Sequence, residues 1–135
     1  MSEEIVSLRI KSCLKNVAKV ESLLEKLRVQ FNINDTQYGN MMLASVEAVT
    51  NAIEHGNSLD AQKEVSIIAR KSATSFRLII KDQGNGFDPD GLPDPTKPEF
   101  KEQPDGRGVF LMRQLADEVA FSDGGRTVEM FFVVS

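Results

Sequence analysis

Three polar residues recur at every fourth position, Glu47, Asn51 and His55, in a segment whose apolar residues follow helical spacing. At this interval the side chains lie one above the other on a single helix face. Asparagine is unfavourable inside a helix because its amide competes for backbone hydrogen bonds, so its position between Ala48 and Ala52 indicates that the side chain is needed. A carboxylate and a carboxamide oxygen one turn apart suit Mg²⁺, which takes oxygen ligands. Glu47 can equally orient or deprotonate a nucleophile beside the metal.

The same polar stripe is also what a solvated helix face looks like. His55 lies at the expected end of the helix, where the helix dipole favours a cation. We therefore interpret His55 as structural, and we take Glu47 and Asn51 as the candidate catalytic and metal-binding pair.

A glycine-rich turn at residues 82–86 follows the second of two neighbouring apolar segments. Glycine permits positive φ and lets a ligand approach the backbone closely, so Gly84 and Gly86 fit the rim of a binding site. Asp82, at the end of the strand, can accept a hydrogen bond from an exocyclic amino group such as that of adenine. An ordinary strand-end turn explains the same residues, because Asp, Asn and Gly all favour turns.

A second glycine-rich turn, at residues 105–108, leads directly into a helical segment. The free N–H groups and the positive dipole end of a helix N-terminus form a general phosphate site, which Gly106 and Gly108 leave open to a ligand. Arg107 adds a fork-shaped cation that can pair with phosphate. The pattern is neither a P-loop nor a dinucleotide fingerprint, because no G-K-[ST] follows and no strand precedes it. A hinge for the preceding loop is the alternative.

The apolar spacing around these residues predicts the elements that must position them. All five prolines fall between residues 88 and 107, and so long a loop in a compact domain is usually functional, so we expect a lid there. The expected order is strand 3–11, helices 14–31 and 34–55, strands 64–71 and 75–82, lid loop 88–107, a helix from about residue 108, and strands 119–123 and 127–134. This order predicts an α+β two-layer sandwich, with a mixed, mostly antiparallel sheet covered on one face by helices.

Length and composition restrict the class of protein. The 135 residues, 41% hydrophobic and 27% charged, fit a single domain over residues 1–135. A net charge of −4 and a pI near 5.0 argue against nucleic acid as the main partner. No apolar run approaches the roughly 20 residues of a membrane span, and the first residues lack a secretory signal, so we expect a cytoplasmic protein with no membrane partner. Cys13 and His55 are each the only residue of their type, which excludes an internal disulfide and a four-ligand Cys/His zinc site.

Taken together, the motifs resemble the ATP-binding superfamily of gyrase, heat-shock chaperones and histidine kinases, which has the Bergerat fold. Residues 47–56 (EAVTNAIEHG) are similar to the N box of one branch, the anti-sigma-factor serine kinases of bacteria. Residues 82–87 (DQGNGF) resemble the first glycine box of the superfamily, and residues 106–112 (GRGVFLM) resemble the second. Thr127, after a Gly-Gly turn, resembles the threonine that helps to hold adenine. The resemblance covers nearly the whole chain.

The resemblance implies ATP and Mg²⁺ as ligands. Asn51 would ligate the metal, and Glu47 would act as catalytic base or organiser. The other nucleotide-binding residues that the resemblance implies are Asp82, Gly84, Gly86 and Thr127 at adenine, and Gly106, Arg107 and Gly108 at the phosphates. The implied partners are a small anti-sigma-antagonist protein with a STAS domain, which is phosphorylated on serine, a sigma factor, and a second copy of the chain in a homodimer.

These features predict an ATP-dependent serine/threonine protein kinase with an anti-sigma-factor-like role in partner switching. The chain offers candidates for nucleotide, metal and charge stabilisation, and the acceptor hydroxyl must come from a partner. The alternative is a non-catalytic module of the same fold that binds a protein in an ATP-dependent manner. A histidine-kinase fragment is disfavoured, because the only histidine, His55, lies inside the nucleotide helix.

Overall fold

The computed structural model describes residues 4–86 and 104–134, with the backbone alone described for residues 104–107. Its elements are β1 (Glu4–Lys11), a 3-10 turn (Leu14–Asn16), α1 (Val17–Phe31), α2 (Asp35–Asn51), a π-helical turn (Ala52–Gly56), β2 (Glu64–Lys71), β3 (Ser75–Lys81), α3 (Pro104–Leu115), β4 (Glu118–Ser122), a 3-10 turn (Asp123–Gly125) and β5 (Thr127–Val133). This is the order expected from the sequence. The expected lid loop at 88–107 lies largely outside the described residues, and residues 104–107 belong to α3 instead.

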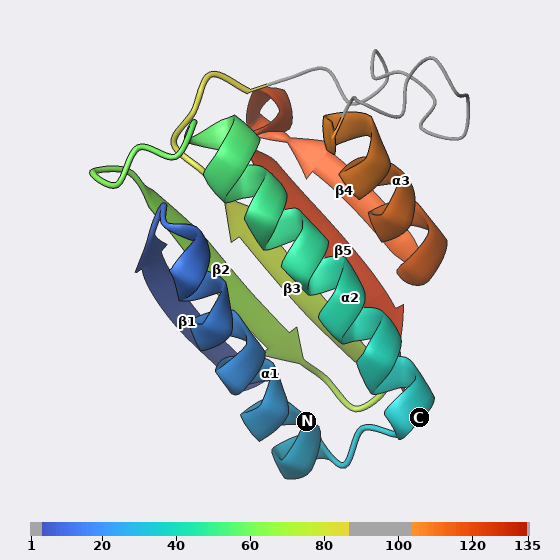
Figure 1. The fold of residues 1–135 in the computed structure, drawn as a ribbon. Coiled ribbons are helices and arrows are strands. Elements are labelled where there is room, and N and C mark those ends of the chain that lie inside the picture. The colour runs from blue at the N-terminus through green and yellow to red at the C-terminus, as the bar shows by residue number, and fades with distance from the viewer. Residues whose placement is uncertain (1–3, 87–103, 135) are drawn as a thin grey trace.

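The strands form one five-stranded sheet in the order β1-β2-β3-β5-β4 (Figure 1). Every neighbouring pair of these strands is antiparallel, so the expected α+β sandwich is confirmed, but the sheet is not mixed over the described residues. The reason lies in the connections. Two antiparallel helices join β1 to β2, so the chain re-enters the sheet at the end where it left and runs back beside β1.

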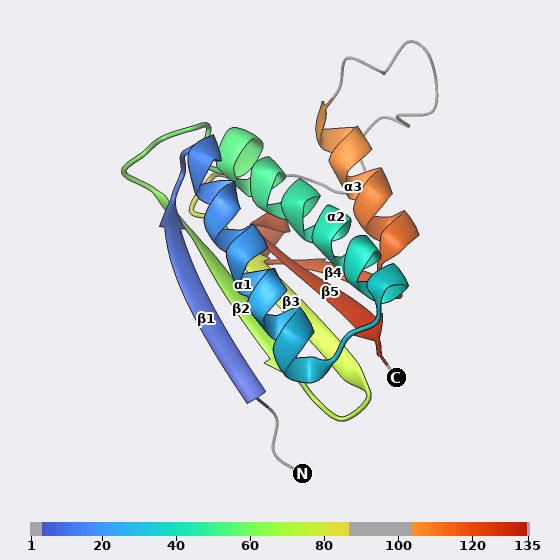
Figure 2. The ribbon, with the colours of Figure 1, turned by 60° about the horizontal axis from the view of Figure 1, so that its bottom comes forward.

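All three helices lie on one face of the sheet, with α2 between α1 and α3 (Figure 2). Alternation along the strands produces this arrangement, since β3 buries Phe76, Leu78 and Ile80 beneath the helices and turns Arg77 to the open face. The helix α2 fits above these residues because its buried side chains include the small Ala44 and Ala48, and the buried Ala52 follows at the start of the π-helical turn. Within the described part of the chain, every helix falls short of the length and apolar character of a membrane span.

The helix α2 begins and ends at positions that its sequence explains. The Asn34 side chain caps the start, where its Oδ1 accepts a hydrogen bond from the Gln37 backbone N–H at 2.9 Å. At the other end the α-helix widens into the π-helical turn Ala52–Gly56, and the Asn57 N–H donates to the Ala52 carbonyl at 2.8 Å. The expected helix at 34–55 therefore has the right extent, but its last turn is π-helical. Single π turns often occur at functional sites.

We expect Leu78→Ala to lower the free energy of unfolding by about 2–5 kcal/mol, because the fully buried side chain would leave a cavity between the two layers. Its neighbour Ile79 points to the open face of the sheet and is half-buried, so Ile79→Ala should cost clearly less. Urea denaturation of both variants beside the wild-type protein measures the difference. Equal losses would contradict a sheet that is covered on one face only.

Candidate functional site

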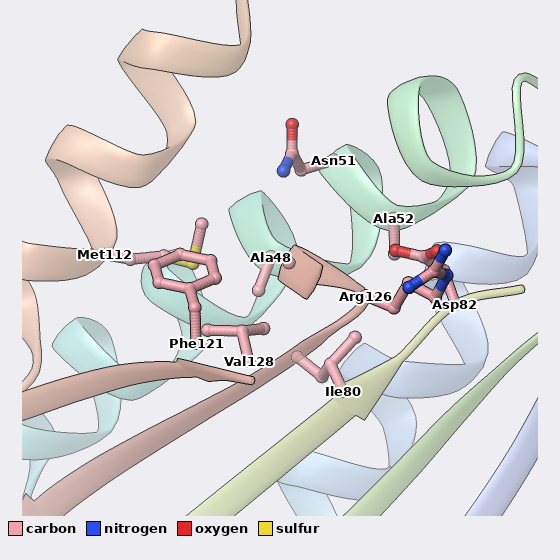
Figure 3. Close-up of a pocket in the computed structure, with 10 residues that line it drawn as sticks. Ala48, Asn51, Ala52, Ile80, Asp82, Met112, Phe121, Arg126 and Val128 are labelled. Atoms are coloured by element: carbon pink, nitrogen blue, oxygen red, sulfur yellow. The ribbon is translucent and has the colours of Figure 1, made fainter. Parts of the chain in front are cut away.

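A pocket lies between α2, α3 and the sheet, at the ends of β3, β4 and β5 (Figure 3). Its lining residues are Ala48, Asn51, Ala52, Ile80, Asp82, Met112, Phe121, Gly125, Arg126 and Val128. Most of this lining is apolar, and the polar side chains come from Asn51 on α2 and from Asp82 and Arg126 at the strand ends. Figure 3 shows Asn51 pointing away from the other two, which lie close together. An apolar slot with a few polar groups is the usual form of a small-molecule site.

Asp82 follows the last residue of β3, and its side chain is buried, with 6% of the residue exposed. Its backbone N–H donates to the Arg126 carbonyl at 2.9 Å, and its Oδ1 accepts from the Gly84 N–H at 2.8 Å. Burial raises the pKa of the Asp82 carboxyl above its ordinary value, although the Gly84 hydrogen bond and the Arg126 charge act in the opposite direction. The pocket therefore contains a buried carboxyl group that can accept a hydrogen bond from a ligand.

The glycines of the first turn are required by close backbone contacts. A Cβ on Gly84 would lie 1.6 Å from the Gly56 carbonyl oxygen, and a Cβ on Gly56 would lie 2.3 Å from Asp82 Oδ2. Gly86 has a φ of 80°, and a Cβ there would lie 2.1 Å from the Gly124 carbonyl oxygen. Neither Gly84 nor Gly86 is among the lining residues. The structure therefore explains both glycines by packing, and their expected closeness to adenine stays a prediction.

A buried hydrogen-bond network supports this turn from behind. Asn57 is fully buried, and its Nδ2 donates to Ser12 Oγ at 2.7 Å and to the Glu64 carbonyl at 3.1 Å. Its Oδ1 accepts from the Gln83 N–H at 2.7 Å. Asn57 thus ties the residue after Asp82 to the end of β1 and the start of β2. No local sequence pattern marks Asn57 or its distant partners.

Asn51 reaches the pocket from the last turn of α2. Its Oδ1 is buried and has no hydrogen-bond partner among the described residues. Such an orphaned carbonyl costs about 1–3 kcal/mol, so it is rare unless a ligand supplies the missing partner. An oxygen of this kind suits Mg²⁺, which needs few protein ligands when phosphates and water complete its shell. No cluster of three His, Cys, Asp or Glu side chains that could hold a metal occurs in residues 4–86 and 104–134.

Glu47 lies one helical turn before Asn51 and faces α3. A Cβ on Gly108 would lie 3.7 Å from Glu47 Oε2, so the carboxylate stands against the backbone of α3. Glu47 is half-buried and Gly108 is buried. The structure therefore brings the predicted pair Glu47 and Asn51 to the α3 side of α2, and it places one glycine of the second motif beside them.

The second glycine motif differs from its expected form. The helix α3 begins at Pro104, so Gly106 and Gly108 lie inside its first turns and not in a turn before it. Proline is favoured at the first helical position, where its missing N–H costs nothing, and this outweighs the low helix propensity of two glycines. The side chain of Arg107 lies outside what the structure describes, so its expected phosphate contact stays a prediction.

Thr127 does not line the pocket, although it was expected at adenine. It opens β5 opposite Lys81 and Ser122, whereas the next residue, Val128, faces the pocket. Because neighbouring residues of a strand point to opposite faces, Thr127 lies on the open face of the sheet. The expected adenine contact of Thr127 stays a prediction, and the residue before it, Arg126, lines the pocket. Arg126 could not be predicted from the sequence, since a single arginine after a Gly-Gly turn has no distinguishing pattern.

The fold and the pocket define a class: a two-layer α+β domain with an apolar slot, which is lined by a buried carboxyl group and by an amide whose oxygen has no hydrogen-bond partner among the described residues. The chain belongs to the histidine kinase-like ATPase domain family, whose model matches residues 10–132. A domain of this family implies ATP binding.

The curated relatives are serine-protein kinases. RsbW of Bacillus licheniformis is 35% identical over 100 residues, which make up 67% of this chain and 61% of that kinase. RsbW of Bacillus velezensis is 31% identical over 112 residues, covering 76% of this chain and 68% of that kinase. RsbW of Staphylococcus aureus strain Newman is 24% identical, covering 95% of this chain and 86% of that kinase. The expected resemblance to anti-sigma-factor serine kinases is confirmed, while the match spans less than two thirds of the length of the first of them.

A solved structure supports the fold independently. The RsbU and RsbW domains of Rv1364c from Mycobacterium tuberculosis superpose with a TM-score of 0.67 at 16% sequence identity. The match covers 98% of this chain and 33% of that one. At this identity the likeness confirms the fold alone.

We expect Asp82→Asn to unfold at a higher temperature than the wild-type protein at about pH 7, with a difference that shrinks toward about pH 4. The pKa of Asp82 is raised above its ordinary 3.8 by burial, so the folded state disfavours the ionised group. The stability that this group contributes is fully present below the unfolded pKa and is lost as pH rises through the folded pKa. The asparagine oxygen can still accept from Gly84, so this hydrogen bond is kept.

Thermal unfolding across this pH range measures the effect, with Asp60→Asn as the control. Asp60 is exposed, and its Oδ1 accepts from the Gln62 N–H, a bond that asparagine can also keep. The control should show no comparable pH dependence. A lower melting temperature for Asp82→Asn at neutral pH would contradict the destabilising burial of this charge.

Proposed function

We propose that this chain binds Mg²⁺-ATP in the pocket between α2 and α3 and transfers the terminal phosphate to a serine of a partner protein. The observation that carries the proposal is the buried Oδ1 of Asn51, which lies one helical turn from Glu47 and has no hydrogen-bond partner in the part of the chain that the structure describes. The family match supports ATP as the ligand, and the relatives named serine-protein kinase support phosphate transfer to serine.

Each end of the pocket has its own task in this proposal. At the β3 end, the buried Asp82 carboxylate accepts a hydrogen bond from the adenine amino group, and apolar residues such as Ile80 and Met112 contact the ring. At the α2 end, the free oxygen of Asn51 fits Mg²⁺. When bound, this ion neutralises charge on the phosphate oxygens. Gly106, Arg107 and Gly108 are proposed to lie by the phosphates, at the N-terminus of α3.

Glu47 is the proposed catalytic base. Its half-buried carboxylate stands beside the backbone of α3, at the end of the pocket assigned to the phosphates. From there it would orient the incoming serine hydroxyl and take its proton as the serine oxygen bonds to the γ-phosphorus of ATP. The bond between this phosphorus and the oxygen that bridges it to the β-phosphate would break, and ADP would leave. The acceptor hydroxyl comes from the partner.

The biological setting is proposed from the family. We propose that the chain works in the cytoplasm as a homodimer in a partner-switching system, as one domain over residues 1–135. Its phosphorylated partner would be a small STAS-type anti-sigma-antagonist protein, and its second partner a sigma factor. The relatives named RsbW support this setting.

We expect Asn51→Ala to weaken Mg²⁺-dependent ATP binding by at least about tenfold, because it removes the only metal-binding oxygen proposed from the protein. The fold should be retained, since the lost oxygen makes no hydrogen bond with the described residues. Asn40→Ala is the matched control, because Asn40 is exposed on the same helix. Calorimetric titration with ATP, with and without Mg²⁺, measures the effect. Wild-type affinity in Asn51→Ala would remove the metal assignment.

We expect Glu47→Gln to bind ATP normally and to transfer phosphate about 10²–10⁴-fold more slowly, because glutamine cannot accept the serine proton. Glu21→Gln, at an exposed position of α1, is the control. Transfer of labelled phosphate from ATP to purified STAS-domain proteins measures the rate. Undiminished transfer by Glu47→Gln would disprove the base assignment. ATP binding by the wild-type protein without transfer to any of them would favour the non-catalytic module.

A further inference from the structure

The side chain of Arg126 holds two separate turns at the edge of the pocket. Its Nε donates to the Gly84 carbonyl at 2.8 Å, and its Nη2 donates to the Asn85 carbonyl at 3.2 Å. Its Nη1 donates to the Asp123 carbonyl at 2.8 Å. One guanidinium therefore joins the turn after β3, which carries Asp82, to the turn between β4 and β5.

The backbones of these two turns touch each other directly. A Cβ on Gly86 would lie 2.1 Å from the Gly124 carbonyl oxygen, and a Cβ on Gly124 would lie 2.9 Å from Arg126 Nη1. The turn between β4 and β5 is left-handed, with φ values of 54° at Asp123, 64° at Gly124 and 90° at Gly125. A positive φ is unfavourable at a non-glycine residue, so Asp123 depends on its surroundings. Arg126 supplies them, since its backbone N–H also donates to the Asp123 carbonyl, at 3.2 Å.

The same residue is bonded to Asp82 through its main chain. The Arg126 carbonyl accepts from the Asp82 N–H at 2.9 Å. Gly84 is bonded to both residues, because its N–H donates to Asp82 Oδ1 and its carbonyl accepts from Arg126 Nε. Both side chains line the pocket and lie close together in Figure 3. A shift of the Arg126 side chain would therefore move the segment that orients the Asp82 carboxylate.

We propose that Arg126 is a positioning residue of the nucleotide site. It fixes the turn at residues 82–86 so that the Asp82 carboxylate is held in place to bind adenine. This rests on the proposed function, in which Asp82 reads the adenine amino group. The arrangement requires arginine, because three N–H groups of one planar fork point at three carbonyls. Lysine has a single ammonium group and cannot reach all three. The charge alone is therefore not enough.

The test is calorimetric ATP binding by Arg126→Lys, Asp82→Asn and the double variant. Arg126→Lys keeps the positive charge and should raise the Kd for ATP about tenfold, the effect of losing hydrogen bonds to a charged group. If Arg126 acts through Asp82, the double variant should bind no more than about twofold more weakly than Asp82→Asn. If the role of Arg126 were merely structural, the fold-increases in the Kd for ATP of the two single variants would multiply in the double variant. Arg77→Lys makes the same change on the open face, where Arg77 pairs with Glu129, and should leave the Kd unchanged.

Hydrogen exchange of the protein without nucleotide separates this proposal from the proposed function. The Gly84 amide should exchange clearly faster in Arg126→Lys than in the wild-type protein, and the amide of Leu78 in mid-strand should not. If the exchange rate of the Gly84 amide is unchanged in Arg126→Lys, the positioning role of Arg126 is overturned, whether or not the wild-type protein binds ATP. If the wild-type protein binds no ATP, the proposed function is overturned. Wild-type ATP affinity in Arg126→Lys, or multiplying effects in the double variant, would also overturn it.

Discussion

The Gly56 carbonyl and the backbone of Gly84 meet where the π-helical turn after α2 ends and where the chain leaves β3. No side chain fits between them, since a Cβ on Gly84 would lie 1.6 Å from that oxygen. Asp82 lies against the same glycine, because its Oδ2 is 2.3 Å from the position that a Cβ on Gly56 would take. The carboxyl group is buried beside this contact, and it still lines the pocket. Burial raises the pKa of Asp82, and the close approach of these two glycines lies beside the buried carboxyl group.

The helix α2 connects this contact to the other end of the pocket. Asn51 is the last residue of the α-helical part, Glu47 lies one turn before it, and Gly56 ends the π-helical turn after it. The helix packs between α1 and α3 above the sheet, with Val49 and Ile53 fully buried. Such a helix cannot shift without disturbing the core. The core of the fold therefore sets the distance between the proposed metal-binding end of the pocket and its proposed adenine-binding end.

The sequence predicted those features that depend on local patterns. Strands at 64–71 and 75–82 match β2 and β3 to within one residue, because alternating burial is visible in the order of apolar residues. The start of α3 was misplaced, since two glycines looked like a turn. Asn57 and Arg126 could not be found in this way. Their partners are mainly backbone atoms of distant segments, such as Gln83 for Asn57 and Gly84 for Arg126, and no local pattern marks such a contact.

Two polar side chains that are buried away from the pocket have partners among the described residues. Ser45 Oγ donates to the Met41 carbonyl, and Asn16 Nδ2 donates to the Lys11 carbonyl. Among the described residues, the Tyr38 hydroxyl and Asn51 Oδ1 are the buried side-chain atoms that lack a hydrogen bond of ordinary geometry.

For Tyr38 the surroundings account for the missing hydrogen bond, because the Glu25 carboxylate lies nearby as an acceptor. Burial and then this carboxylate raise the pKa of the Tyr38 hydroxyl. Asn51 has no such neighbour among the described residues, and it also breaks the rule against asparagine inside a helix. A side chain that is unfavourable both for its helix and for its burial lowers stability without any return to the fold. Proteins retain such positions where a ligand completes the bonding. The Asn51 oxygen, which lacks a partner among the described residues, therefore supports the proposed metal more strongly than the motif around it does.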